Sequence, residues 1–221
     1  MSLPVLYYEE SCPYSIRAAM ALLYSGTSFE LKPVSGDKPP RELLEQNDQG
    51  VLQFPILKVK GNKPCAHSME IMQWALLQND PDGWLDFEVD ELEEMHGLVR
   101  INDSSFARDV IAYVESGDEK SSARDQYRKD CELFLAGLED HLQDRKFLFG
   151  DRVSYADFAI FPFVDLFATV RIDWFRKAMF PNVWQWLDYH KNNRLYKTIN
   201  GDHGQHQADA PFAQPQSPGL Q

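Results

Sequence analysis

Apolar and polar positions follow two different patterns along the chain, and the pattern changes near residue 80. The run "LPVLYY" (3–8) is short and apolar, which is typical of a strand buried on both faces. It is followed by a stripe with helical spacing that stops at Gly26. The apolar positions of this stripe are Ile16, Ala19, Met20 and Leu23.

The next segments continue an α/β pattern. Residues 28–34 alternate between apolar and polar side chains, which predicts a strand. Residues 39–47 predict a short helix. Residues 54–66 predict two strands joined by a Gly61-Asn62 turn. Helical spacing returns over 68–78. The expected order is strand, helix, strand, helix, hairpin, helix, with a right-handed crossover between the first two strands.

After the turn formers "QNDPDG" (78–83) the pattern is helical throughout. Ser154 and Asp157 have the spacing of a capping pair, and Pro162 should kink the helix that contains it. We therefore expect an α/β domain over 1–78, a linker over 79–88, an all-helical domain over 89–200, and a Gln/Pro-rich tail over 201–221. The helices expected in the second domain are 89–115, 122–144, 154–170 and 174–192.

Charge and cysteine content narrow the function classes. The net charge of −12 argues against nucleic acid and anionic membrane surfaces as partners, since both attract basic patches. Three cysteines, Cys12, Cys65 and Cys131, suit a reducing compartment better than a disulfide framework. The N-terminus does not read as a signal peptide, and no apolar run approaches the ~20 residues of a membrane span. We expect a cytoplasmic protein.

Cys12 lies where the first strand gives way to the first helix, in the stretch "SCPYS" (11–15). Pro13 suits the first helical position, which makes Cys12 the N-cap residue. Unpaired backbone N–H groups and the helix dipole there favour thiolate over thiol. Ser15 is close enough in sequence to donate a hydrogen bond back to the sulfur. The alternative is that Cys12 is a small buried apolar residue.

Four motifs occur in the order found in one superfamily. "CPYS" resembles the active-site motif of glutaredoxins and cysteine-type glutathione transferases, and "FPIL" resembles their proline motif with Phe54 in place of Val. "HSMEIMQWAL" is similar to their glutathione-binding motif with His67 in place of Glu, and "SYADFAIFPFV" is similar to their C-terminal capping-box helix. The resemblance covers about residues 1–195. It implies a thioredoxin-like α/β domain followed by a helical bundle.

The resemblance also implies roles for individual residues. Cys12 would be the nucleophile, assisted by Ser15. Pro55 would follow a cis peptide bond, so that the backbone of Phe54 faces glutathione, the co-substrate. The other residues implied in glutathione binding are Pro13, Tyr14, Lys38, His67 and Ser68.

Several of these residues also have plainer interpretations. Pro55 would suit the start of an edge strand, and Ser68 would suit a simple N-cap. Lys38, taken by itself, is better explained as a solvated lysine. His67 would hydrogen-bond a carboxylate of glutathione or lie free on the surface, and the contact usually made by Glu is left open.

Other candidate groups carry less weight. Cys65 and Cys131 have no helix-terminus context and are expected to be buried and inert. "HGQH" (203–206) falls short of a metal site, so no metal is expected. The acidic run "DELEE" (90–94) is expected to be a solvated helix face.

A single cysteine with serine at position 15 implies a monothiol cycle, because no resolving thiol is present there. The expected reactions are deglutathionylation and dehydroascorbate-type reduction, with glutathione and a small disulfide or electrophile as partners. Residues near Arg100, Asp103, Ser104 and Arg108 are expected to shape the second substrate's pocket. The alternatives are a non-enzymatic binding or regulatory protein and a transferase-type isomerase, and the chain would be a monomer or a homodimer.

Overall fold

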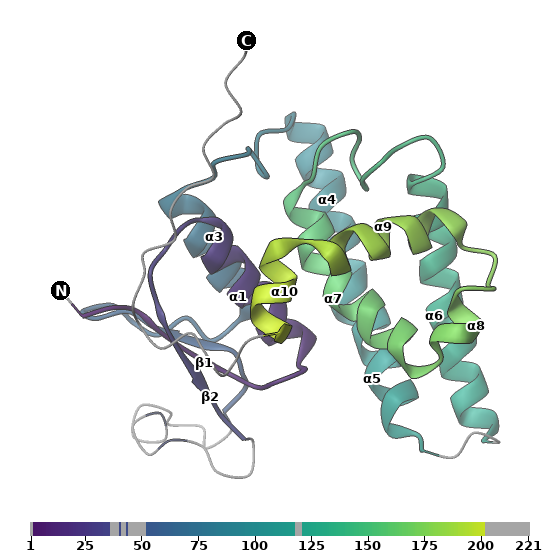
Figure 1. Cartoon of the computed structure of the whole chain (residues 1–221), viewed down its shortest axis with the longest axis horizontal. Coiled ribbons are helices and arrows are strands. Elements are labelled where there is room, and N and C mark those ends of the chain that lie inside the picture. Colours follow the sequence, from purple (N-terminus) through teal and green to yellow (C-terminus); the bar gives the residue numbers. More distant parts are fainter. Residues whose placement is uncertain (1, 36–39, 41–42, 44–51, 118–120, 202–221) are drawn as a thin grey trace.

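A computed structural model describes residues 2–35, 40, 43, 52–117 and 121–201. Three predicted features lie wholly outside these residues: Lys38, the tail beyond residue 201 and the "HGQH" pair within it. Most of the helix expected over 39–47 also lies outside them. Figure 1 shows a small sheet with its helices on one side of the molecule and a larger helical part on the other.

The sheet contains three strands in the order β2-β1-β3. Their bounds are β1 (Val5–Tyr8), β2 (Glu30–Pro33) and β3 (Ile56–Lys58). β1 runs parallel to β2 and antiparallel to β3, with Leu6 opposite both Leu31 and Leu57. The hairpin expected over 54–66 is reduced on its second side to one bridge between Leu57 and Cys65.

Two helices accompany the sheet, α1 (Pro13–Tyr24) and α3 (Ser68–Gln78), and they pack against each other. α1 ends at Tyr24, just before Gly26 as expected. Gly26 follows the C-cap residue Ser25 and has a φ of 69°, a left-handed conformation that glycine adopts readily. The interior of α1 is buried almost all round, so this helix lies in the core rather than on the surface.

The rest of the described chain is helical, which confirms the expected fold class of an α/β part followed by an all-helical part. The helix expected over 89–115 is continuous but contains a π-helical turn. The segment expected as 174–192 is two helices, because Pro181 begins the second. The elements are α4 (Val89–Ile101), η1 (Asn102–Phe106), α5 (Ala107–Glu115), α6 (Ser122–His141), α7 (Tyr155–Val170), α8 (Ile172–Phe175), α9 (Pro181–Asn192) and α10 (Arg194–Gly201).

α7 is the central helix of this part, and its expected capping box is confirmed. The Asp157 carboxylate accepts hydrogen bonds from the Ser154 backbone N–H and hydroxyl, and from the indole N–H of Trp186 at 2.8 Å. Burial raises the pKa of Asp157, while these bonds oppose the shift. The carboxylate thus joins the start of α7 to α9.

α10 was not expected from the sequence, and its position comes from tertiary contacts. Tyr196 packs edge-on against Phe161 of α7, with 4.8 Å between ring centroids, and donates a hydrogen bond to Asp165. Asp165 also binds Lys191 of α9. These contacts hold α10 on α7, and α10 also packs against α1, beside which it lies in Figure 1.

No helix within the described ranges is long and apolar enough to span a membrane.

The His190 imidazole is fully buried among aromatic rings. Phe158 and Trp186 lie edge-to-face with it, at centroid distances of 5.1 and 5.0 Å. Neither ring nitrogen has a hydrogen-bond partner, and burial lowers the pKa of His190 from 6.5 to about 3. The folded protein therefore holds this ring neutral under conditions where an unfolded chain would protonate it.

This burial predicts a loss of stability in acid. Below pH 6.5 His190 becomes protonated in the unfolded chain but stays neutral in the folded protein. The free energy of unfolding should therefore fall as pH drops toward about 3. The contribution approaches about 1.4 kcal/mol per pH unit. Urea unfolding of His190→Phe should show a shallower acid slope than the unchanged protein. Equal slopes would show that His190 does not contribute.

Candidate active site around Cys12

Cys12 is the N-cap residue of α1, as the sequence predicted, and Pro13 occupies the first helical turn. Its φ and ψ of −78° and 120° are extended, and its carbonyl accepts the Ile16 N–H at 2.9 Å. The side chain is half-buried and makes no capping hydrogen bond. The sulfur therefore lies at the positive end of the helix dipole without being used as a cap.

The turn that presents Cys12 has a conformation uncommon for its residues. Ser11 has a φ of 61°, in the left-handed region that non-glycine residues rarely adopt. The buried Ser15 hydroxyl accepts the Glu9 backbone N–H at 3.1 Å. Ser15 thus fixes the turn before the cysteine, and the donor contact to the Cys12 sulfur remains a prediction.

A hollow of about 630 Å³ opens beside Cys12. It is lined by the turn before α1 and by the end of β2 with the residues after it. Of the described residues expected to bind glutathione, none lines this hollow. The lining residues are Glu9, Glu10, Ser11, Cys12, Pro33, Val34 and Ser35.

The peptide bond between Phe54 and Pro55 is cis, as expected. Pro55 is buried directly before β3, and Phe54 packs on a small apolar cluster with Tyr7 and Ile56. The contact of the Phe54 backbone with glutathione remains a prediction.

α3 begins at Ser68 and ends at Gln78, as the helical spacing predicted. His67, not Ser68, is the N-cap residue, and its carbonyl accepts the Ile71 N–H at 3.0 Å. The His67 side chain is exposed, and Ser68 is the buried first residue of the helix. A plain N-cap role for Ser68 is therefore wrong, because its hydroxyl accepts a hydrogen bond from Arg17 instead.

Arg17 is a buried residue at the center of the site that sequence reasoning missed. Its Nε donates to Ser68 Oγ at 2.9 Å, and its two terminal nitrogens bind Asp103 at 2.8 and 2.9 Å. A further bond reaches the Ala159 carbonyl of α7 at 3.3 Å. The signal in the sequence is one arginine within an otherwise small and apolar run, "SIRAAMALL" (15–23).

Tyr14 packs across to the helical part of the molecule. Its ring meets Phe163 edge-on at a centroid distance of 4.8 Å, and it lies against the Arg17 guanidinium. Burial raises the pKa of Tyr14, with a further contribution from Asp103. These contacts account for Tyr14 without glutathione, and its role in binding remains a prediction.

The residues expected to shape a second pocket are engaged elsewhere or lie apart from the hollow. Asp103 pairs with Arg17, Arg108 pairs with Asp109, and the Ser104 hydroxyl bonds the Ile101 carbonyl. Arg100 is exposed on α4. None of these residues lines the hollow beside Cys12.

The two other cysteines differ from each other. Cys131 is buried as expected, and burial strongly raises its pKa, which keeps it a thiol. Cys65 is only half-buried, contrary to expectation, because its strand is reduced to a single bridge. Its pKa is also raised, by burial and then by Glu70.

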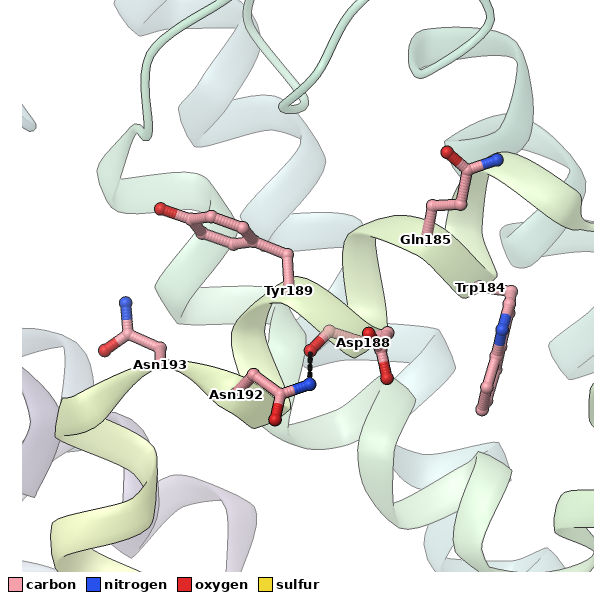
Figure 2. Close-up of a pocket in the computed structure, with 6 residues that line it drawn as sticks. All are labelled: Trp184, Gln185, Asp188, Tyr189, Asn192 and Asn193. Carbon is pink, nitrogen blue, oxygen red and sulfur yellow. Dashed lines mark hydrogen bonds between the residues drawn. The ribbon is translucent and has the colours of Figure 1, made fainter.

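In the described part of the chain, no three His, Cys, Asp or Glu side chains gather as metal ligands would. A separate hollow of about 600 Å³ lies along α9, where Figure 2 shows polar side chains pointing outward. It is lined by Trp184, Gln185, Asp188, Tyr189, Asn192 and Asn193, and none of these is among the expected site residues.

Comparison with known families gives two matches in sequence order. The model for the glutathione S-transferase N-terminal domain matches residues 6–83, and the model for the C-terminal domain matches residues 121–188. A probable glutathione S-transferase from Nicotiana tabacum is 23% identical over 187 residues, which covers 81% of this chain and 80% of that protein.

Solved structures share the fold. Poplar glutathione transferase F1 with a serine-to-cysteine substitution has a TM-score of 0.75 and 18% identity, over 90% of this chain and 97% of that one. A glutathione S-transferase-I bound with lactoylglutathione has a TM-score of 0.73 and 19% identity, over 90% and 99%. The thioredoxin-like part and the helical part expected from the motifs are thereby confirmed.

The hydrogen bond between Glu9 and Ser15 predicts a measurable cost when it is removed. Ser15→Ala should lower the free energy of unfolding by about 1–2 kcal/mol, because the partly buried backbone N–H of Glu9 loses the Ser15 hydroxyl as its acceptor. Chemical denaturation measures this, with Ser35→Ala on an exposed segment as the control. A loss no larger than that of the control would contradict the anchoring role.

Proposed function

Because the chain belongs to the glutathione S-transferase superfamily, we propose that it is a glutathione-dependent thiol transferase acting through the single thiol of Cys12. The observation that carries the proposal is the cysteine at the N-cap of α1, beside an open hollow. A helix N-terminus stabilises negative charge, and the thiolate is the form that attacks disulfides.

Glutathione would bind on the side of Cys12 formed by β3 and α3. The backbone N–H and C=O of Phe54 are suited to pair with its cysteinyl unit, held by the cis bond to Pro55. The N-terminus of α3 and the Ser68 hydroxyl would hold its γ-glutamyl carboxylate. Two related proteins have been solved with glutathione or lactoylglutathione bound, which supports this class of ligand.

Three other residues complete the proposed site. The exposed His67 side chain lies beside Ser68 and would reach a carboxylate of the bound peptide. Pro13 and Tyr14 would border the thiol from the α1 side. Lys38 stays a candidate for a glutathione carboxylate and lies outside the described residues.

The proposed reaction is a two-step exchange. The Cys12 thiolate attacks the glutathione sulfur of a glutathionylated substrate, forming an enzyme–glutathione disulfide and releasing the substrate as a thiolate, which takes up a proton. The thiolate of a second glutathione then attacks that mixed disulfide, releasing oxidised glutathione and restoring Cys12. One disulfide is consumed and one is formed, so no other oxidant or reductant is needed.

A serine at position 15 fits this monothiol cycle. A dithiol enzyme would use a second cysteine there to release the substrate through an internal disulfide, whereas Ser15 is occupied in the turn with Glu9. Conjugation of glutathione to aryl halides should be poor, because that reaction uses the thiolate of bound glutathione, which Cys12 would instead engage as a disulfide.

The test is turnover of 2-hydroxyethyl disulfide in the presence of glutathione. Cys12→Ser should lower kcat/KM by at least about a hundredfold, because the nucleophile of both steps is removed. Oxidised glutathione should add the mass of one glutathionyl group to the unchanged protein and none to Cys12→Ser, as measured by intact mass spectrometry.

Cys65→Ser is the matched control, since Cys65 is half-buried with a raised pKa and should leave turnover unchanged. Turnover that survives in Cys12→Ser would overturn the proposal. A protein that binds glutathione but neither turns over nor forms the mixed disulfide would be a binding protein on this fold.

A further inference from the structure

We propose that Glu9 and Glu10 are specificity-determining residues, which make the hollow beside Cys12 select a small thiol with a positive charge as the second half of the disulfide substrate. This inference rests on the proposed function, in which Cys12 attacks a mixed disulfide of glutathione, and it names the class of thiol joined to the glutathione. The site is the thiol with its hollow, and the two carboxylates set the charge that this site accepts.

The lining of the hollow carries charge of one sign. Glu9 and Glu10 supply two carboxylates, and no Lys, Arg or His is among the described residues that line it. Apart from Cys12, the remaining side chains are neutral and small. The volume of about 630 Å³ is that of a site for a small molecule. A small ligand in this hollow therefore meets two negative charges next to the nucleophile.

The backbone holds both glutamates close to the sulfur. The Glu9 N–H donates to Ser15 Oγ at 3.1 Å, and the Cys12 N–H donates to the Glu9 carbonyl at 3.4 Å, which closes the turn between them. On the other side of the hollow, the Val34 N–H donates to the Tyr8 carbonyl at 2.8 Å. The two carboxylates thus start from a turn of fixed shape, directly before the nucleophile.

The charge of these glutamates is not neutralised within the described part of the chain. No Lys, Arg or His there forms an ion pair with Glu9 or Glu10. Lys32, on the strand that leads to the hollow, pairs with Glu30 at 4.0 Å. The charge of Glu10 also acts on Tyr8, whose pKa is raised by burial and then by this carboxylate. The hollow therefore keeps a negative potential.

This potential distinguishes the two halves of a mixed disulfide. The glutathionyl half has two carboxylates and one ammonium group, so its net charge is negative and the hollow repels it. That agrees with a glutathione site on the side of β3 and α3, whose expected residues do not line the hollow. A thiol that carries an ammonium group is attracted instead, because unlike charges at short range stabilise each other.

The exchange itself is the one described above. A bond forms between Cys12 and the glutathione sulfur, while the bond from that sulfur to the cationic thiol breaks. The cationic thiol leaves as a thiolate and takes up a proton, and a second glutathione removes the glutathionyl group as oxidised glutathione. Glu9 and Glu10 take no part in these bonds and act only through their charge.

The test uses three mixed disulfides of glutathione, whose other half is cysteamine, 2-mercaptoethanol or 3-mercaptopropionate. These halves are positive, neutral and negative. In the double variant Glu9→Gln/Glu10→Gln, the ratio of kcat/KM for the cysteamine disulfide to that for the mercaptopropionate disulfide should fall about tenfold, with the neutral disulfide in between. Glutamine keeps the side-chain length and the backbone hydrogen bonds of the turn. A change in the ratio is independent of the intrinsic reactivity of each disulfide and of the Cys12 sulfur.

Glu93→Gln/Glu94→Gln is the matched control, because it removes the same charge from exposed positions of α4 outside the hollow. It should leave the ratio unchanged. In the unchanged protein, the same ratio should fall by at least about threefold between low salt and about 0.5 M NaCl, since salt screens exposed charges.

A ratio that the double variant changes by less than about twofold, or that the control lowers equally, would overturn the inference. Thermal unfolding shows whether the double variant folds. If it does not, Glu9→Gln and Glu10→Gln singly and the salt dependence of the unchanged protein decide. Turnover of all three disulfides with no charge dependence would leave the proposed function standing and overturn this inference. Turnover of none of them would contradict the proposed function, and this inference with it.

Discussion

The buried ion pair between Arg17 and Asp103 is the interaction on which the arrangement of the site depends. A charge removed from water costs several kcal/mol unless its hydrogen bonds are satisfied. Arg17, on α1, meets this requirement only when α3, η1 and α7 are all in place, because each of these three supplies one partner. The helix that carries the cysteine, the helix that carries Ser68 and the helical part of the chain are thus joined at one residue.

Much of the fold and part of the site could be predicted from local sequence signals. The start of α1 followed from proline after Cys12, and the start of α7 followed from the spacing of Ser154 and Asp157, because caps depend on neighbouring residues only. The cis bond before Pro55 came from the resemblance rather than from any local pattern.

The features that were missed depend on contacts between distant residues. No residue near Arg17 in the sequence indicates that its partner is Asp103, which lies beyond the α/β part of the chain. α10 is only eight residues long, which makes a helical pattern hard to recognise, and Tyr196 holds it on α7. The hydroxyl of Ser68, the first residue of α3, accepts a hydrogen bond from Arg17 of α1, a partner that no local signal indicates.

The packing of α10 on α1 has a consequence for the order in which the protein matures during synthesis. α1 leaves the ribosome well before α10, the last described helix, which packs against it. Contacts that join the two ends of a sequence form late, since a long loop must close first. α1 is therefore fully covered only after α10 has docked against it.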